Sequence, residues 1–222
     1  MPDVTLINIK EEILSENREL AALLRGRLDD QGVYLVNFMS SPGSGKTSLI
    51  VATLTQLRDT YRIAVIEGDV DSAVDAERVA REGIQAVQIK TGGSCHLTAA
   101  MVEKGLGPLS LDSLDLLLLE NIGNLICPVG SDTGAHLNVA LLSVPEGDDK
   151  PLKYPKIFQT ADAFIVNKTD VLEHFDFDLD VFKGRVRRLN PGAPVFEVSC
   201  KTGQGMDRWC GWLRKKVEGP GE

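Results

Sequence analysis

The chain has 222 residues, of which 43% are hydrophobic and 25% are charged, so it is long enough for one large domain with its own core and too short for two full enzymatic domains. Its formal net charge of -8 argues against binding to nucleic acid, because such a surface repels phosphates. No apolar run approaches the ~20 residues of a membrane span, and the acidic start lacks the pattern of a signal peptide, so we expect no membrane association.

The first thirty residues have the pattern of an amphipathic helix. Leu20, Leu24 and Leu28 recur at helical spacing among charged and polar residues, and Gly32 is a plausible stop. We therefore predict an N-terminal helix within residues 1–32 that packs on a larger unit formed by residues 33–222.

Short apolar runs alternate with helical segments along the rest of the chain. This alternation predicts an α/β fold, a three-layer sandwich in which helices cover both faces of a mostly parallel sheet. Residues 145–155 contain three prolines and are expected to form a loop. The runs that read as buried strands are 33–39, 62–67, 86–90, 114–120, 138–144, 163–168 and 194–199, and the clearest helical segments are 46–59, 72–83, 180–190 and 205–217.

Polar and reactive residues gather directly after these apolar runs. In an open parallel sheet, ligands bind at the carboxyl ends of the strands. We therefore expect one edge of the sheet to collect these residues into a single site. The segments concerned are SPGSGKT, EGDVDS, TGGSCH, ENIGN, NKTD and SCKTG.

The segment that follows the first run matches a phosphate-binding loop, except that Ser40 replaces its first glycine. In such a loop Lys46 would reach the β/γ-phosphate oxygens, and the hydroxyl of Thr47 would bind Mg²⁺. A glycine-rich turn without a ligand is the alternative, but the position between a buried strand and a helix favours nucleotide binding and the fold of a P-loop NTPase. The predicted phosphate-binding residues are Gly43, Ser44, Gly45, Lys46, Thr47 and Ser48.

Two later segments indicate that the base is guanine. The carboxylate of Asp170 in NKTD can accept hydrogen bonds from N1–H and the 2-amino group of guanine, and adenine has no such amino group. Lys168 would stack along the base, and Asn167 would tie its loop to the phosphate loop. Ser199, Cys200 and Lys201 form a string similar to the second guanine loop of GTPases. The alternative is an ordinary turn between a strand and a helix.

Carboxylates at two further strand ends predict a Mg²⁺ site beside the γ-phosphate. Asp69 and Glu120 would join Thr47 there, because Mg²⁺ prefers oxygen ligands. No glutamine is evident to orient the attacking water, so Asp69 or Asp75 is expected to act with Lys46 in hydrolysis. Asp71 is equally well explained as the cap of a helix that begins near Ser72.

Cysteine and histidine residues suggest a second metal site. Cys95 and His96 are adjacent, and Cys127 lies a few residues beyond Glu120. Thiolate and imidazole together suit Zn²⁺ and Ni²⁺, but the spacing alone is a weak signal and favours the alternative, in which the cysteines are small buried hydrophobic residues without a metal. Three ligands suggest an exchangeable site, or one completed by water or a second chain. Four scattered cysteines do not form a disulfide framework, so we expect reduced thiols and a cytoplasmic location.

With these motifs in view, the sequence resembles the HypB family, the GTPases that help insert nickel into NiFe hydrogenase. The resemblance runs from the phosphate loop through GDVDSAVDAERV, TGGSCHL, LLLLENIGNLICP and NKTDV to the last helix. Its most specific part is GNLICP, which follows directly after the switch carboxylate, together with the Cys-His dipeptide. The urease accessory GTPase UreG is similar but carries a Cys-Pro-His triplet, which is absent here.

The resemblance implies a P-loop GTPase domain over residues 33–222 that forms a homodimer across its nucleotide sites under the control of GTP. It also implies that Cys95, His96 and Cys127 hold a transferable Ni²⁺ or Zn²⁺ near the dimer interface. The sequence shows neither the Cys-rich motif nor the His-rich tract of some family members. We therefore expect a HypA-like nickel chaperone to deliver the metal and the precursor of the hydrogenase large subunit to receive it.

The function expected from these observations is that of a GTP-hydrolysing nickel metallochaperone. Loss of the γ-phosphate would move Glu120 and, through a hinge at Gly123, displace Cys127 from the other ligands. One alternative is a metal-binding dimerisation module that uses GTP mainly as a structural ligand. Others are a UreG-like accessory GTPase and, less in keeping with the guanine motifs, a small-molecule kinase.

Overall fold

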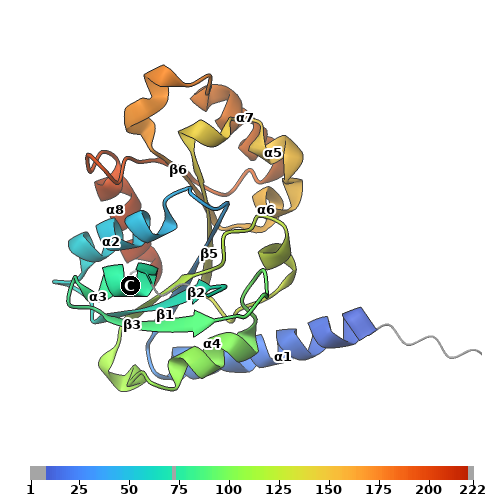
Figure 1. The fold of residues 1–222 in the computed structure, drawn as a ribbon, viewed down its shortest axis with the longest axis vertical. Coiled ribbons are helices and arrows are strands. Elements are labelled where there is room, and N and C mark those ends of the chain that lie inside the picture. Colours follow the sequence, from blue (N-terminus) through green and yellow to red (C-terminus); the bar gives the residue numbers. More distant parts are fainter. Residues whose placement is uncertain (1–8, 72–73, 220–222) are drawn as a thin grey trace, which may run out of the picture.

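The computed structural model describes residues 9–71 and 74–219. The first eight residues of the predicted N-terminal unit and the start of the helix predicted over 72–83 lie outside them. The described residues form a three-layer α/β sandwich (Figure 1), which confirms the fold class that the alternating pattern predicted.

Seven strands form the central sheet, in the order β3-β2-β4-β1-β5-β6-β7. Every pairing is parallel, as in the pair β1–β4, where Val36 faces Leu118. The carboxyl ends of all seven strands therefore meet at one edge of the sheet. The strands are β1 (Tyr34–Ser40), β2 (Ile63–Asp69), β3 (Gln85–Lys90), β4 (Leu116–Glu120), β5 (Leu137–Ser143), β6 (Ala163–Asn167) and β7 (Val195–Glu197).

Helices cover both faces of the sheet because its central strands are apolar on both sides. α2 and α8 pack on one face around the buried Trp209, whereas α1, α4, α6 and α7 cover the other (Figure 1). None of the helices in the described part of the chain combines the length and the hydropathy needed to cross a bilayer. The helices are α1 (Ile9–Asp30), α2 (Lys46–Leu57), α3 (Val74–Ala80), α4 (Ala99–Leu106), α5 (Lys150–Lys153), α6 (Pro155–Thr160), α7 (Leu179–Leu189) and α8 (Met206–Val217). The short 3₁₀ segments are η1 (Leu111–Ser113), η2 (Cys127–Gly130), η3 (Val144–Glu146) and η4 (Thr169–His174).

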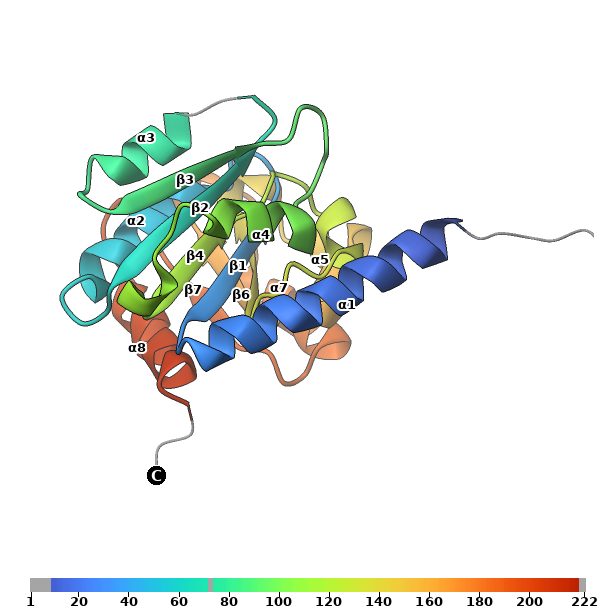
Figure 2. The same cartoon turned by 90° about the horizontal axis from the view of Figure 1, so that it is seen from below.

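The N-terminal helix α1 lies beside α4, and its N-terminal half extends beyond the sheet (Figure 2). Leu24 and Leu28 are buried against α4 and the sheet, as their spacing predicted. The Arg25 guanidinium donates to both carboxylate oxygens of Asp132, at 2.9 and 3.0 Å, and the side-chain amide of Asn17 donates to the Asp132 carbonyl at 2.7 Å. α1 is thus fastened to the segment that follows η2.

The loop predicted over residues 145–155 is wrong, because η3, α5 and the start of α6 occupy it. Its three prolines, Pro145, Pro151 and Pro155, each lie in the first turn of one of these short helices. A proline is tolerated there because that turn's N–H groups have no partner within the helix. The structure also contains α4, which the sequence pattern did not predict. Thr98 caps this helix, since its side-chain oxygen accepts a hydrogen bond from the backbone N–H of Met101 at 3.4 Å.

Candidate functional site

The phosphate loop joins the buried end of β1 to the first turn of α2. Gly45 immediately precedes α2 with a φ of 96°, in the left-handed region that favours glycine. A Cβ atom at Gly45 would lie only 2.6 Å from the side-chain nitrogen of Asn167. A glycine is therefore required at this position both by the backbone and by the approach of the second loop.

Lys46 and Thr47 point toward the end of β4. The Lys46 ammonium donates to the Ser40 hydroxyl at 3.1 Å and lies 3.9 Å from Glu120 Oε1. The Thr47 hydroxyl donates to the same Glu120 oxygen at 3.1 Å, and the other oxygen, Oε2, is buried without a hydrogen-bond partner. A hydroxyl beside a carboxylate oxygen with spare acceptor capacity fits the oxygen donor set that Mg²⁺ takes.

A second buried carboxyl group, which sequence reasoning missed, lies beside Glu120. Glu67 in β2 is the register partner of Glu120 in β4, and both side chains are buried. Burial and then the neighbouring Glu120 raise the pKa of Glu67 to about 10, and burial also raises the pKa of Glu120. The pattern could have revealed Glu67, because it stands two residues before Asp69 at the same strand end.

The Glu67→Gln variant should be more stable than the unmodified protein at pH 8 when both are free of nucleotide and metal. The pKa of Glu67 is higher in the folded protein than in the unfolded chain. The protonated Glu67 side chain therefore contributes its full share of stability below the pKa that it has in the unfolded chain, and this share declines as the pH rises toward about 10. The stability advantage of the variant should therefore grow between pH 6 and pH 8, by up to about 1.4 kcal/mol per pH unit. Denaturant unfolding at the two pH values measures it. The exposed Glu19→Gln variant is the control, and an equal trend in both variants would contradict this interpretation.

Three aspartates lie at the end of β2 and just beyond it, and the sequence associated two of them, Asp69 and Asp75, with Mg²⁺ or hydrolysis. Asp69 and Asp75 both line a cavity of about 600 Å³ together with Lys46, Thr47 and Glu120. Asp69 Oδ1 also accepts from the backbone N–H of Asp71 at 2.9 Å. Asp71 itself is exposed, and the alternative in which it caps a helix near residue 72 falls outside the described residues.

The loop after β6 is fixed to the phosphate loop by its own side chains. Asn167 donates from its side-chain amide to the Ser44 carbonyl at 3.0 Å. Its side-chain oxygen accepts from the backbone N–H of Lys168 at 2.8 Å and of Cys200 at 3.3 Å, so it also reaches the loop after β7. Lys168 is the only non-glycine residue with a positive φ in the described chain, and its ammonium donates to the Gly43 carbonyl at 2.8 Å.

Asp170 lines a cavity of about 760 Å³ together with Asn167, Cys200 and Lys201. Ser199 does not line this cavity; its buried hydroxyl donates to Asp170 Oδ1 at 2.7 Å. This hydrogen bond lowers the pKa of Asp170, so the group is an acceptor at neutral pH. A fixed carboxylate in the wall of the cavity is chemically suited to the paired N–H donors of guanine.

The two cavities adjoin, because both are lined by Gly45, Ser48, Lys168 and Arg78. Arg78 of α3 is a further residue that the sequence reasoning missed. The larger cavity has room for a base and its sugar, and the smaller one has the cationic and hydroxyl groups suited to phosphates. Together they form one trough along the carboxyl ends of the strands.

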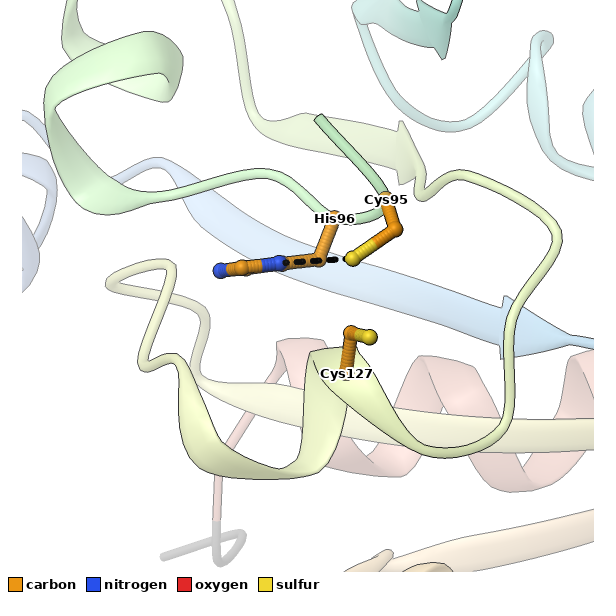
Figure 3. A group of neighbouring side chains, drawn as sticks. All are labelled: Cys95, His96 and Cys127. Atoms are coloured by element: carbon orange, nitrogen blue, oxygen red, sulfur yellow. Dashed lines mark hydrogen bonds between the residues drawn. The ribbon is translucent and has the colours of Figure 1, made fainter. Parts of the chain in front are cut away.

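Cys95, His96 and Cys127 come together although their two segments are far apart in the sequence (Figure 3). Their ligand atoms all lie within 4.8 Å of one another, and Cys95 Sγ is 3.6 Å from His96 Nδ1. Cys127 is the first residue of η2, and its backbone N–H donates a hydrogen bond to the side-chain oxygen of Asn124 at 3.3 Å. Two sulfur atoms and one imidazole at this spacing can hold a single Zn²⁺ or Ni²⁺.

The protonation states of these groups link metal binding to pH. A hydrogen bond with the Cys127 side chain, and then burial, raise the pKa of the Cys95 thiol, whereas burial lowers the pKa of His96. The imidazole is therefore neutral and ready to bind at pH 7. The thiol must lose its proton to a bound metal, so affinity should rise with pH. The remaining cysteines lie elsewhere: Cys200 lines the nucleotide-sized cavity and Cys210 is buried in α8.

Backbone contacts join the metal ligands to the trough. The loop that carries Cys95 begins with hydrogen bonds from Thr91 N–H to the Asp69 carbonyl, at 3.0 Å, and from Gly92 N–H to the Val70 carbonyl, at 3.1 Å. In the other segment, a Cβ atom at Gly123 would lie 3.0 Å from the backbone of Pro42 in the phosphate loop. Gly123 does not adopt a positive φ, so a glycine is needed here for its close approach to that loop, and the hinge at this residue stays a prediction.

The chain is similar to proteins of known family and structure. Residues 34–197 match the family described as "CobW/HypB/UreG, nucleotide-binding domain". The chain is 45% identical over 213 residues to the hydrogenase maturation factor HypB of Azotobacter vinelandii, covering 95% of this chain and 70% of the relative. A crystal structure of HypB from Helicobacter pylori in complex with nickel superposes with a TM-score of 0.86 at 42% identity, covering 91% of this chain and 96% of that one. The crystal structure of HypB from Archaeoglobus fulgidus superposes with a TM-score of 0.85 at 42% sequence identity, covering 91% of this chain and 99% of that one.

Proposed function

The chain belongs to the HypB family of hydrogenase maturation factors, and from that premise we propose that it is a GTP-hydrolysing nickel metallochaperone whose metal site responds to the bound nucleotide. The observation that carries the proposal is the meeting of the candidate thiol and imidazole ligands with the loops that surround the trough. Nickel is the proposed cargo, which is supported by the nickel complex of the Helicobacter pylori relative.

GTP is the nucleotide that the residues of the trough favour. Lys46 and the N-terminal amides of α2 would bind the phosphates, and Asp170 would accept from the guanine base. Within this loop, the backbone N–H of Ser199 donates to the Gln204 carbonyl at 2.9 Å, and that of Cys200 donates to the Asn167 side chain. We therefore assign the donor for the guanine O6 atom to the backbone N–H of Lys201. When Mg²⁺ is bound, Thr47, Asp69 and Glu120 would hold it, and it would neutralise charge on the β- and γ-phosphates.

Hydrolysis would rest on fixed charges rather than on a side chain that takes a proton. Lys46 and the amides of the loop would stabilise the charge that develops on the phosphate oxygens. Asp69 or Asp75 is the candidate to orient the attacking water, since both line the phosphate-sized cavity. With no glutamine in that role, we expect slow intrinsic turnover, and a fast unassisted single-turnover rate would contradict it.

The Asp170→Asn variant should lose affinity for GTP by about 5- to 150-fold, because the amide places donors against the donors of guanine. Its affinity for xanthosine triphosphate should rise, since xanthine offers a carbonyl where guanine has an amino group. Fluorescence titration with labelled nucleotides measures both changes. The exposed Asp176→Asn variant controls for the loss of one charge, and a variant at Asp170 that keeps the preference for guanine would contradict the assignment.

Release of the metal would follow loss of the γ-phosphate. The chain runs from Glu120 to Cys127 past Gly123, which packs on Pro42, so movement at the phosphate loop would reach one of the three metal ligands.

A homodimer across the nucleotide sites is supported by the exposed apolar side chains of Val70, Val74 and Ile126 near the trough and the metal cluster. We further propose a HypA-like donor, the hydrogenase large-subunit precursor as acceptor, and a cytoplasmic location, which the free thiols support.

Transfer of nickel under controlled nucleotide state tests the proposal. The purified protein is loaded with Ni²⁺ and mixed with a colorimetric chelator that competes for the metal. Release should be faster when GTP is hydrolysed to GDP than when a non-hydrolysable GTP analogue is bound. Equal release rates, or absence of GTP hydrolysis in the presence of Mg²⁺, would contradict the proposed function.

A further inference from the structure

Leu97 directly follows the candidate metal ligand His96 and is fully buried. Its side chain packs on the end of β2, where a Cβ atom at Gly68 would lie 2.7 Å from Leu97 Cδ1. Gly68 immediately precedes Asp69 in the trough. The residue next to one metal ligand therefore rests on the strand end that carries a candidate Mg²⁺ ligand.

The backbone of Leu97 is held from two other directions. Its N–H donates to the side-chain oxygen of Asn121 at 3.1 Å, and its carbonyl accepts from the Ser131 hydroxyl at 3.2 Å. Asn121 immediately follows Glu120, and Ser131 ends the 3₁₀ turn that Cys127 begins. Leu97 thus contacts both the residue that follows Glu120 and the residue that follows the turn begun by Cys127.

Asn121 is itself held firmly. It is fully buried, its side-chain oxygen also accepts from the backbone N–H of Ile122 at 2.9 Å, and its side-chain nitrogen donates to Asn37 at 3.2 Å. Asn37 in turn donates to the Asn138 side chain at 2.9 Å. A buried amide with every one of these bonds made cannot shift without moving its partners, because an unpaired buried polar group is unfavourable.

We propose that Leu97, Asn121 and Ser131 form a buried bracket that transmits the position of Glu120 to both segments of the metal site. The inference rests on the proposed function, since it assigns residues to the coupling between nucleotide and metal. When Glu120 moves with the nucleotide, Asn121 carries Leu97 and His96 with it, and Ser131 ties the same movement to the turn that presents Cys127. These are positioning residues, and they bind neither metal nor nucleotide.

The test measures the dissociation constant of Ni²⁺ with GDP and with a non-hydrolysable GTP analogue, and takes their ratio. A hydroxyl that only supports the fold would change both constants equally and leave the ratio as it was. In Ser131→Ala the ratio should move toward one by about fivefold, the effect of one buried hydrogen bond, with nucleotide affinity unchanged. Ser131→Thr, which keeps the hydroxyl, should restore it. Ser113→Ala is the matched control, because that exposed hydroxyl also donates to a backbone carbonyl, at 2.7 Å, away from the site.

A second variant tests the bracket through the contact between Leu97 and Gly68. Gly68→Ala forces the Leu97 side chain to move and should weaken Ni²⁺ binding by nucleotide-free protein at least about threefold, although no metal ligand changes. An unchanged affinity in Gly68→Ala, or a wild-type ratio in Ser131→Ala, overturns the bracket. A ratio of one in the unmodified protein contradicts the proposed function instead, so the two failures are distinguishable.

Discussion

Replacing Lys46 with alanine should lower the rate of GTP hydrolysis by about 10²- to 10³-fold, the usual loss when one fixed donor to a developing charge is removed. The Lys46 ammonium is buried and lies 3.1 Å from the Ser40 hydroxyl. It also lies 3.9 Å from Glu120, the carboxylate that is a candidate ligand for Mg²⁺. Its removal leaves the phosphate-sized cavity without that charge. Single-turnover release of phosphate measures the loss.

The same variant separates two functions. If turnover drives delivery, Lys46→Ala should abolish nucleotide-dependent nickel transfer. If GTP is mainly a structural ligand of a metal-binding module, transfer should persist. Lys156→Ala, which removes an exposed lysine of α6, is the matched control, and hydrolysis at the wild-type rate in Lys46→Ala would contradict the role of the phosphate loop.

Replacing Cys127 with alanine should weaken Ni²⁺ binding by at least about 100-fold. The loss removes one of only three candidate ligand atoms, which lie within 4.8 Å of one another, and leaves a thiol and an imidazole that cannot enclose the ion. The absorption band from sulfur-to-nickel charge transfer should weaken in parallel. Titration with Ni²⁺ against a competing chelator measures both effects.

A second cysteine provides the control for this result. Cys210 belongs to α8 and is buried in the core that α8 forms with α2 and the sheet, so Cys210→Ala should keep the nickel affinity while it lowers stability slightly. Nickel binding that survives in Cys127→Ala, or that is lost in Cys210→Ala, would place the metal elsewhere on the chain.

The sequence allowed the fold and the edge that carries the site to be predicted, because buried parallel strands have a strong local signal. The run that becomes β4 reads LLLLE and is buried throughout, so its direction and the position of Glu120 at its end follow from its pattern. The meeting of Cys95 with Cys127 did not follow in this way. Their spacing left a metal site and ordinary buried thiols as alternatives, and only the paths of the two segments beyond β3 and β4 bring the sulfur atoms together.

Other features depend on tertiary contacts that a linear pattern does not contain. The position of Glu67 near a strand end is visible in the sequence, but its raised pKa is not, because this depends first on burial and then on the register of β2 and β4, which sets Glu67 opposite Glu120. The prolines of 145–155 indicated a loop by composition, yet each lies in the first turn of a short helix, and two of these helices, α5 and α6, pack beside α7. Leu97 carries no chemical signal of its own, since its importance lies in the three segments that it contacts.

The central claim is that the γ-phosphate, bound at one end of the trough, controls the affinity of the sulfur and imidazole cluster for its metal. Its most direct test is the Ni²⁺ dissociation constant of the unmodified protein with Mg²⁺ and either a non-hydrolysable GTP analogue or GDP. The account predicts that nickel binds at least about fivefold more tightly with the GTP analogue. Equal dissociation constants in the two nucleotide states would contradict it.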